Sequence, residues 1–297
     1  MATQAPNNLP LLYRGLEPLS RQVHGDKKVR RIATIPGVNE AHAVPVTVDE
    51  FMLAGRFFPI IFSAGDQPVP LALMGLHEGA NTFFDRDGKL NDPGVYVPAY
   101  LRRYPFMLAR LTDATDQLSL CFDPTANAVG SFDDGEALFD GENPSQGTND
   151  ILAFCEQFEQ AGQRTGAFMT DIKAMGLLMD GEVAIQPEGS EQPFIYRGFQ
   201  MIDEAKFRDL RGDELRKMNQ NGMLALIMAH LFSLALVRDI FARHVNQGSG
   251  PEGFNPSDAA PAAAANGDHA ARNGGPTDGN GADHDGAVND AVEPAKA

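Results

Sequence analysis

The sequence predicts an α+β fold with an antiparallel, sheet-rich first half, a helical second half and a disordered acidic C-terminal tail. Short apolar runs separated by turn residues fill the first half, which is typical of antiparallel strands with short connections. The later segments follow the order helix, hairpin, helices, and they do not alternate as in a parallel α/β sheet. From residue 246 onward the chain is mainly Ala, Gly, Asp, Asn and Pro, which cannot bury enough apolar surface to offset the entropy of ordering.

The first half contains five candidate strands and two short helices. Thr47 and Glu50 have the spacing of a capping box, which predicts a short helix over residues 51–57. A second helical turn over residues 100–104 stops before Pro105, because a residue that precedes proline disfavours the helical conformation. The runs that we expect as strands are 59–63, 71–76, 81–84, 106–111 and 118–122.

The second half begins with a loop-like stretch, residues 123–149, and then becomes helical. Apolar side chains at three- and four-residue steps predict a helix over residues 149–175, with Asn149 as its cap. Residues 183–185 and 193–199 indicate a hairpin. The remaining helices are expected to start at residue 203, to cover 212–218 and to cover 223–244.

The most apolar segment is Met223–Val237, and it raises the question of a membrane span. A run of about 15 residues is roughly 22 Å long as a helix, which is shorter than the ~30 Å hydrocarbon layer. His230 lies in its middle, and Arg238 and Asp239 follow it. The sequence therefore favours a buried core helix, and we expect no transmembrane span.

The charge pattern separates a folded region from the tail and disfavours nucleic acid as a partner. We expect one α+β domain over residues 1–245, with a possible sub-boundary near 123–149, and a disordered tail over residues 246–297. The formal net charge is −16, whereas phosphate backbones need a basic surface. The short basic cluster at residues 27–31 is expected to be solvated.

The N-terminus predicts the compartment, and the cysteines are expected to form no disulfide. The first residues lack the basic start and apolar run of a signal peptide, so the cytoplasm is the expected location. Cys121 and Cys155 are expected to be buried thiols, because a chain with a full core does not depend on disulfides.

Metal, cofactor and catalytic motifs are weak in this sequence. Residues 85–88 start like a calcium loop. However, Tyr96 occupies the twelfth position, where such a loop has a bidentate carboxylate, so a turn is favoured. The acidic stretch at residues 133–142 is favoured as a solvated loop. No zinc spacing, phosphate-binding glycine loop or nucleophile elbow is present, so we expect no metal and no cofactor.

Two groups of polar side chains are candidates for a ligand site. An arginine fork beside aromatic residues suits a carboxylate or phosphate ligand, although an internal ion pair explains it equally well. The buried helical histidine is favoured as a core residue bonded to a neighbouring element, and the alternative is the floor of a pocket that faces Glu204 or Arg102. The candidate ligand-binding residues are Tyr100, Arg102, Arg103, Glu204, His230 and Ser233.

Several segments in order resemble the SapC family of bacterial proteins. The most specific is the run at residues 96–106, Tyr-Val-Pro-Ala-Tyr-Leu-Arg-Arg-Tyr-Pro-Phe, and residues 58–62 and 226–234 match as well. The resemblance covers residues 9–245. It implies an association with bacterial surface layers (S-layers) and implies no catalytic residue, because none is established for the family. A peptide permease of the same name is a different protein.

Three functions remain open at this point. The leading hypothesis is a soluble, non-enzymatic accessory or binding protein linked to cell-surface functions, with an unknown protein or a small anionic ligand as its partner. The second is an enzyme or enzyme subunit that acts on a small anionic substrate, with His230 as its acid or base. The third is a surface-layer component exported by a signal-independent route.

Overall fold

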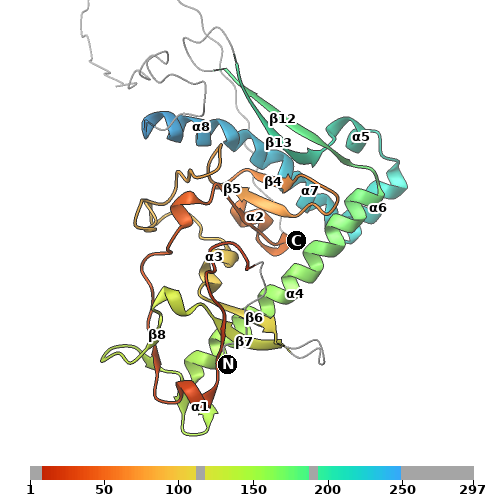
Figure 1. Cartoon of the computed structure of the whole chain (residues 1–297). Coiled ribbons are helices and arrows are strands. Elements are labelled where there is room, and N and C mark those ends of the chain that lie inside the picture. The colour runs from red at the N-terminus through yellow and green to blue at the C-terminus, as the bar shows by residue number, and fades with distance from the viewer. Residues whose placement is uncertain (1–8, 112–117, 187–192, 249–297) are drawn as a thin grey trace, which may run out of the picture. The chain divides into compact units, whose positions relative to one another are not determined.

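The largest sheet in the computed structural model, which describes residues 9–111, 118–186 and 193–248, has five antiparallel strands in the order β12-β13-β4-β5-β3 (Figure 1). Its first-half strands are short, and its hairpin from the second half is long. The strand bounds are β3 Ala43–Pro45, β4 Ile60–Ser63, β5 Pro70–Leu73, β12 Leu178–Ile185 and β13 Phe194–Ile202. The protein is therefore α+β, as the sequence predicts.

A second antiparallel sheet has the order β1-β7-β6, a third has the order β8-β2-β9, and β10 pairs with β11. The predicted strand at residues 81–84 is reduced to one bridge between Phe84 and Leu90, because a tight turn separates these residues. The bounds of these strands are β1 Glu17–Pro18, β2 Lys28–Val29, β6 Phe106–Arg110, β7 Leu118–Phe122, β8 Val129–Gly130, β9 Glu136–Ala137, β10 Phe139–Asp140 and β11 Asn143–Pro144.

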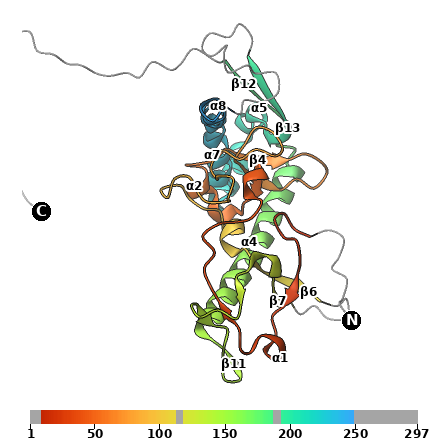
Figure 2. The same ribbon diagram turned by 60° about the vertical axis from the view of Figure 1, so that its left-hand side comes forward.

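The helices are concentrated in the second half, and α4 is the longest of those described. The α-helices are α1 Arg21–His24, α2 Phe51–Ala54, α3 Ala99–Arg103, α4 Gln146–Ala174, α5 Glu204–Arg208, α6 Gly212–Gln220, α7 Met223–Ser233 and α8 Val237–Asn246. The 3₁₀ turns are η1 Val38–Glu40, η2 Val48–Glu50, η3 Pro124–Ala126 and η4 Leu234–Leu236. In Figures 1 and 2, α4 passes from β6 and β7 towards β4 of the large sheet.

The start of α4 differs from the sequence prediction by three residues. We expected Asn149 as the cap, but the hydroxyl of Ser145 accepts a hydrogen bond from the backbone N–H of Thr148 at 3.2 Å. The helix therefore begins at Gln146. Serine and asparagine are both good caps, so the local sequence could not distinguish these two starts.

The main hydrophobic core joins the large sheet to α2, α4, α7 and α8. Phe62 and Ile202 are fully buried from the sheet side, and Ile172, Ile227 and Val237 are fully buried from the helices. Cys121 and Cys155 are both buried and free, which confirms the expectation of buried thiols.

The apolar segment predicted as one helix over residues 223–244 consists of α7, η4 and α8. By length and composition it is long and apolar enough to cross a membrane, and about a third of its most apolar window is buried. Its inner face carries polar groups that hydrogen-bond the rest of the fold. The Nε2 of His244, for example, accepts a hydrogen bond from the backbone N–H of Leu76 at 3.0 Å. On the outer face, Phe232 is 71% exposed.

Candidate functional site

The six residues predicted for a ligand site lie in three places. Helix α3 carries Tyr100, Arg102 and Arg103, and helix α7 carries His230 and Ser233. Glu204 is the first residue of α5. The carboxylate of Glu204 is exposed and accepts a hydrogen bond from the side chain of its neighbour one turn later, Arg208, at 2.7 Å. The structure thus brings the three α3 residues together and leaves Glu204 apart in a local ion pair.

His230 and Ser233 are fully buried and bind the backbone of the large sheet. The His230 ring stacks on Phe62, with 4.5 Å between the ring centroids. Its Nδ1 lies 2.8 Å from the carbonyl of Ile60, and its Nε2 accepts a hydrogen bond from the N–H of Ile202 at 3.1 Å. The hydroxyl of Ser233 accepts a hydrogen bond from the N–H of Ile60 at 2.8 Å. These are the contacts of a core histidine bonded to neighbouring strands.

The buried position of His230 makes the stability of the protein depend on pH. Burial lowers the pKa of His230 to about 4 from its ordinary value near 6.5. Between these values an unfolded histidine takes up a proton, whereas the folded one stays neutral. The contribution of His230 to the free energy of unfolding is therefore fully present above pH 6.5. As the pH drops towards 4, about 3 kcal/mol of this free energy is lost.

Urea unfolding followed by circular dichroism at several pH values measures this effect. The variant His230→Gln has no ring to titrate at this position. Its loss of stability between pH 6.5 and 4 is expected to be smaller than that of the wild type by about 3 kcal/mol. Parallel pH profiles for the two proteins would show that His230 does not titrate in this way.

A buried carboxylate, Glu50, fixes the position of α3. It accepts hydrogen bonds from the N–H of Ala99 at 2.6 Å and from the hydroxyl of Tyr96 at 2.7 Å. The backbone N–H and the hydroxyl of Thr47 also donate to it, at 3.2 and 3.0 Å. The predicted capping box is present, and the same carboxylate holds the first residue of α3.

Arg103 is a buried cation that is only partly satisfied. It is 7% exposed, and its guanidinium lies 4.1 Å from the ring centroid of Phe158. One terminal nitrogen lies 3.3 Å from the carboxylate of Glu159. Its Nε is buried and has no hydrogen-bond partner among the residues that the structure describes. A buried N–H without a partner is costly, so this nitrogen lowers the stability of the fold.

The other two α3 residues differ in where their polar ends point. Tyr100 donates its hydroxyl proton to the carbonyl of Leu11 at 2.7 Å, so this hydroxyl is used within the fold. Arg102 donates to the carbonyl of Val97 and to the hydroxyl of Tyr96, both at 3.0 Å. No carboxylate of the described part of the chain forms an ion pair with Arg102.

Arg102 and Arg103 line a cleft of about 790 Å³, which we call the arginine cleft. Arg30 and Arg31 also line it, so the basic cluster that the sequence suggested as solvated contributes two more cations. The guanidinium of Arg30 lies 4.0 Å from the ring centroid of Phe132. Among the described residues, no carboxylate forms an ion pair with Arg30 or Arg31.

The arginine cleft is also lined by three acidic residues, Asp134, Glu136 and Asp150. An added Cβ at Gly147 would lie 2.6 Å from a carboxylate oxygen of Glu136. Glu136 therefore sits at the first turn of α4, where the positive end of the helix dipole favours a negative charge. The cleft is lined by four arginines and three carboxylates, and Arg103 also pairs with Glu159, so the charges of the cleft nearly balance in a protein with a net charge of −16.

Cys155 also lines the arginine cleft, from the side of α4. It is 1% exposed, and burial raises the pKa of its thiol to about 11. The thiol is therefore protonated near neutral pH and is a poor nucleophile. Within the described residues, no group of three His, Cys, Asp or Glu side chains is arranged to hold a metal ion.

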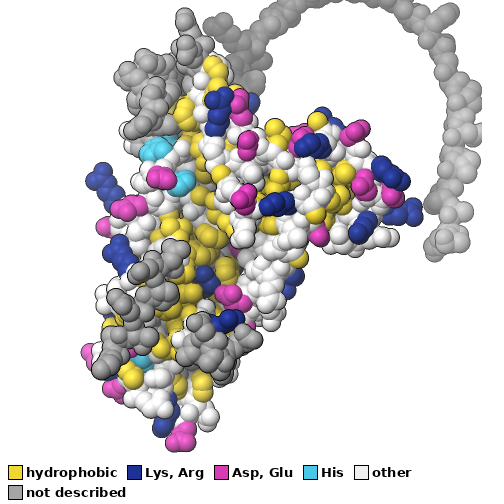
Figure 3. Space-filling model, turned by 45° about the vertical axis from the view of Figure 1, so that its right-hand side comes forward, with side chains coloured by type: hydrophobic (Ala, Val, Ile, Leu, Met, Phe, Trp, Pro, Cys, Tyr) yellow, Lys and Arg dark blue, Asp and Glu magenta, His cyan; other side chains and the backbone are white. Residues whose placement is uncertain are grey.

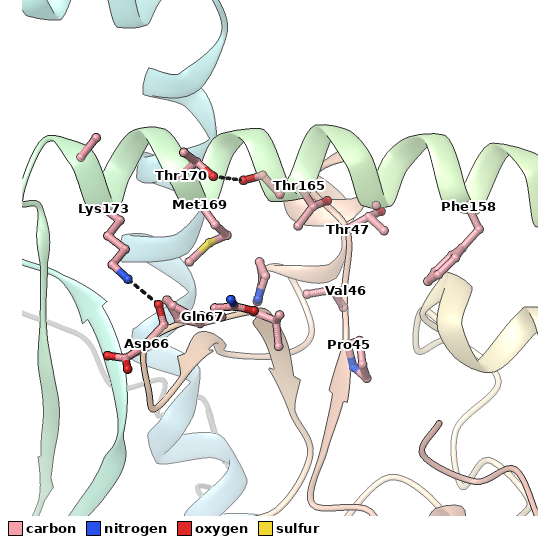
Figure 4. Close-up of a pocket in the computed structure, with 16 residues that line it drawn as sticks. Pro45, Val46, Thr47, Asp66, Gln67, Phe158, Thr165, Met169, Thr170 and Lys173 are labelled. Carbon is pink, nitrogen blue, oxygen red and sulfur yellow. Dashed lines mark hydrogen bonds between the residues drawn. The ribbon is translucent and has the colours of Figure 1, made fainter. Parts of the chain in front are cut away.

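A second hollow, of about 760 Å³, lies further along α4 (Figure 4). We call it the α4 groove. One side is formed by residues 158–174 of α4, including Phe158 and Met169, and the other by residues 45–47 and 66–70. Lys173 closes one end by donating a hydrogen bond to the carbonyl of Asp66. On the face drawn in Figure 3, hydrophobic side chains form a band with charged side chains at its margins.

The fold is α+β, and the candidate ligand site is built on α3 and α4. The sequence matches the SapC family over residues 19–240, which is most of the chain, and the protein belongs to this family. No curated protein and no solved structure matches it.

Proposed function

We propose that this SapC-family protein is a non-enzymatic binding protein that captures a small anionic ligand in the arginine cleft. The observation that carries the proposal is the exposed guanidinium of Arg102, which lines the cleft and forms no ion pair with a described carboxylate. An oxyanion in the cleft supplies an acceptor for this group. The planar guanidinium fork matches the geometry of a carboxylate or a phosphate.

The surroundings of Arg103 support an anion as the ligand. Arg102 and Arg31 are exposed and line the same cleft. They add positive charge next to a nitrogen that is already removed from water, where electrostatic attraction is stronger than in bulk solvent.

The lining of the cleft supports binding more than catalysis. No histidine is among its described lining residues, and His230 is sealed against β4 and β13. Burial raises the pKa of Tyr104, another lining residue, to about 12. Together with the protonated thiol of Cys155, this leaves few groups that can exchange a proton near neutral pH.

The proposal includes a link to cell-surface functions, which rests on the known association of the family with surface layers. We place the protein in the cytoplasm, as an accessory to surface assembly. Fractionation of the native cells measures the location, and recovery of the whole population in the surface layer would contradict this part of the proposal.

The variant Arg102→Gln is expected to bind inorganic phosphate at least about tenfold more weakly than the wild type, because a charge-assisted hydrogen bond is lost. Isothermal titration calorimetry at low salt measures this affinity, and added salt should weaken it. The side chain is exposed, so the fold is expected to remain intact.

Arg208→Gln is the matched control, because it removes the same charge from an exposed pair on α5. It is expected to bind phosphate like the wild type. The proposal fails if the wild type does not bind phosphate, or if both variants lose affinity equally.

A further inference from the structure

We propose that the anion bound in the arginine cleft is the head group of a single-chain amphiphile whose apolar chain lies in the α4 groove. This inference rests on the proposed function, and it names the class of ligand that the same site takes. Two observations carry it: the two hollows follow one face of one helix, and their linings differ in chemistry.

The arginine cleft and the α4 groove lie end to end along α4. Asp150 and Phe154 line the cleft, whereas Phe158, Gly162 and Met169 line the groove. These positions are separated by four or seven residues, so they share a face of the helix. At 1.5 Å per residue, the stretch from Asp150 to Met169 is about 28 Å long.

Phe158 lies between the two hollows. Its ring lines the groove, and the guanidinium of Arg103, which lines the cleft, lies 4.1 Å from its centroid. A ligand whose anionic group reaches Arg103 thus has an apolar surface directly beside it. An anion with an attached hydrocarbon chain matches this sequence of surfaces.

The groove itself is suited to a hydrocarbon chain. Val46, Val69 and Met169 are among its apolar lining residues. Lys173 and Asp66 close one end of the groove with polar groups. The apolar stretch of the groove, from Phe158 to Met169, is therefore about 16 Å long along the helix. A single chain of moderate length, instead of a paired-chain lipid, fits this space.

Two glycines keep the α4 groove open. A Cβ added at Gly162 or Gly166 would meet no atom within 4 Å, although both residues line the groove. Glycine weakens a helix relative to alanine, and no steric conflict requires it at either position. Open space above two unfavourable helix residues is expected where a ligand occupies that space.

Calorimetry with two phosphates that share the same head group tests the inference on the full chain. Dodecyl phosphate, used below its micellar concentration, is expected to bind at least about 100-fold more tightly than ethyl phosphate, because the added methylenes leave water. Equal affinities would overturn the chain site and leave the proposed anion site standing. Failure of both probes to bind would overturn both.

The variant Gly162→Leu fills the groove and leaves the cleft unchanged. It is expected to reduce the affinity for dodecyl phosphate to within about threefold of that for ethyl phosphate, and to leave ethyl phosphate binding at the wild-type value. Circular dichroism checks that the helix is retained, and Gly166→Leu is a second variant with the same expected effect.

Phe232→Ala is the control for unspecific binding of the chain, because it removes an exposed apolar ring outside the groove. It is expected to bind both probes like the wild type. Tight binding of dodecyl phosphate that resists both Gly162→Leu and Arg102→Gln would overturn the inference, since the chain would then bind elsewhere.

Discussion

Replacing His230 with alanine is expected to lower the free energy of unfolding by about 4 kcal/mol or more, because the change leaves two buried backbone groups without partners. These are the carbonyl of Ile60 and the N–H of Ile202, which the two ring nitrogens bind. The lost ring also leaves a cavity against Phe62. Urea unfolding at pH 7, followed by circular dichroism, measures the change.

The matched control for His230→Ala is Phe232→Ala, two residues away on the outer face of α7. Its ring is 71% exposed, so its removal is expected to cost no more than about 0.5 kcal/mol. A folded His230→Ala protein of wild-type stability that no longer binds phosphate would show that the histidine belongs to the ligand site and not to the core.

Replacing Glu50 with alanine is expected to destabilise the protein by about 3–5 kcal/mol and to weaken phosphate binding. Its carboxylate accepts hydrogen bonds from Thr47, Tyr96 and Ala99, and the donors that are buried would remain unpaired. Because Ala99 is the first residue of α3, the two arginines later in this helix would lose their anchor. Unfolding curves and phosphate titrations of the same samples measure both effects.

Asp49→Ala is the control for the loss of an acidic residue in the same turn. Asp49 is exposed and pairs with Arg164 at 2.6 Å, and such surface pairs contribute at most about 1 kcal/mol. We expect near-normal stability and normal phosphate affinity. If Glu50→Ala behaves like Asp49→Ala, then the carboxylate does not position α3.

The sequence predicts the elements of this fold better than the contacts between them. The α+β class, the hairpin and the helix near residues 149–175 follow from local periodicity. The capping box of Thr47 and Glu50 is confirmed as well. The bond from Glu50 to Ala99 joins residues 49 positions apart, and no local pattern contains that information.

For the candidate site as well, the sequence predicts single residues better than the contacts that bring them together. The arginine pair of α3 stands out in the sequence beside its aromatic neighbours. Arg30 and Arg31 lie about 70 residues earlier in the chain, and only the folded structure places them at the same cleft. Local charge could have identified these four cations as unusual in an acidic protein. The glycines of α4 were visible as weak points of a helix, but the open space beside them required the structure.

The most direct test of the anion site is the position of a bound anion in crystals of the full chain soaked in selenate, which resembles phosphate and scatters anomalously. The predicted result is an anomalous peak in the arginine cleft, within hydrogen-bond distance of Arg102 and beside Arg103. Peaks confined to other surfaces, with the cleft empty at selenate concentrations that saturate binding in solution, would contradict the proposed site.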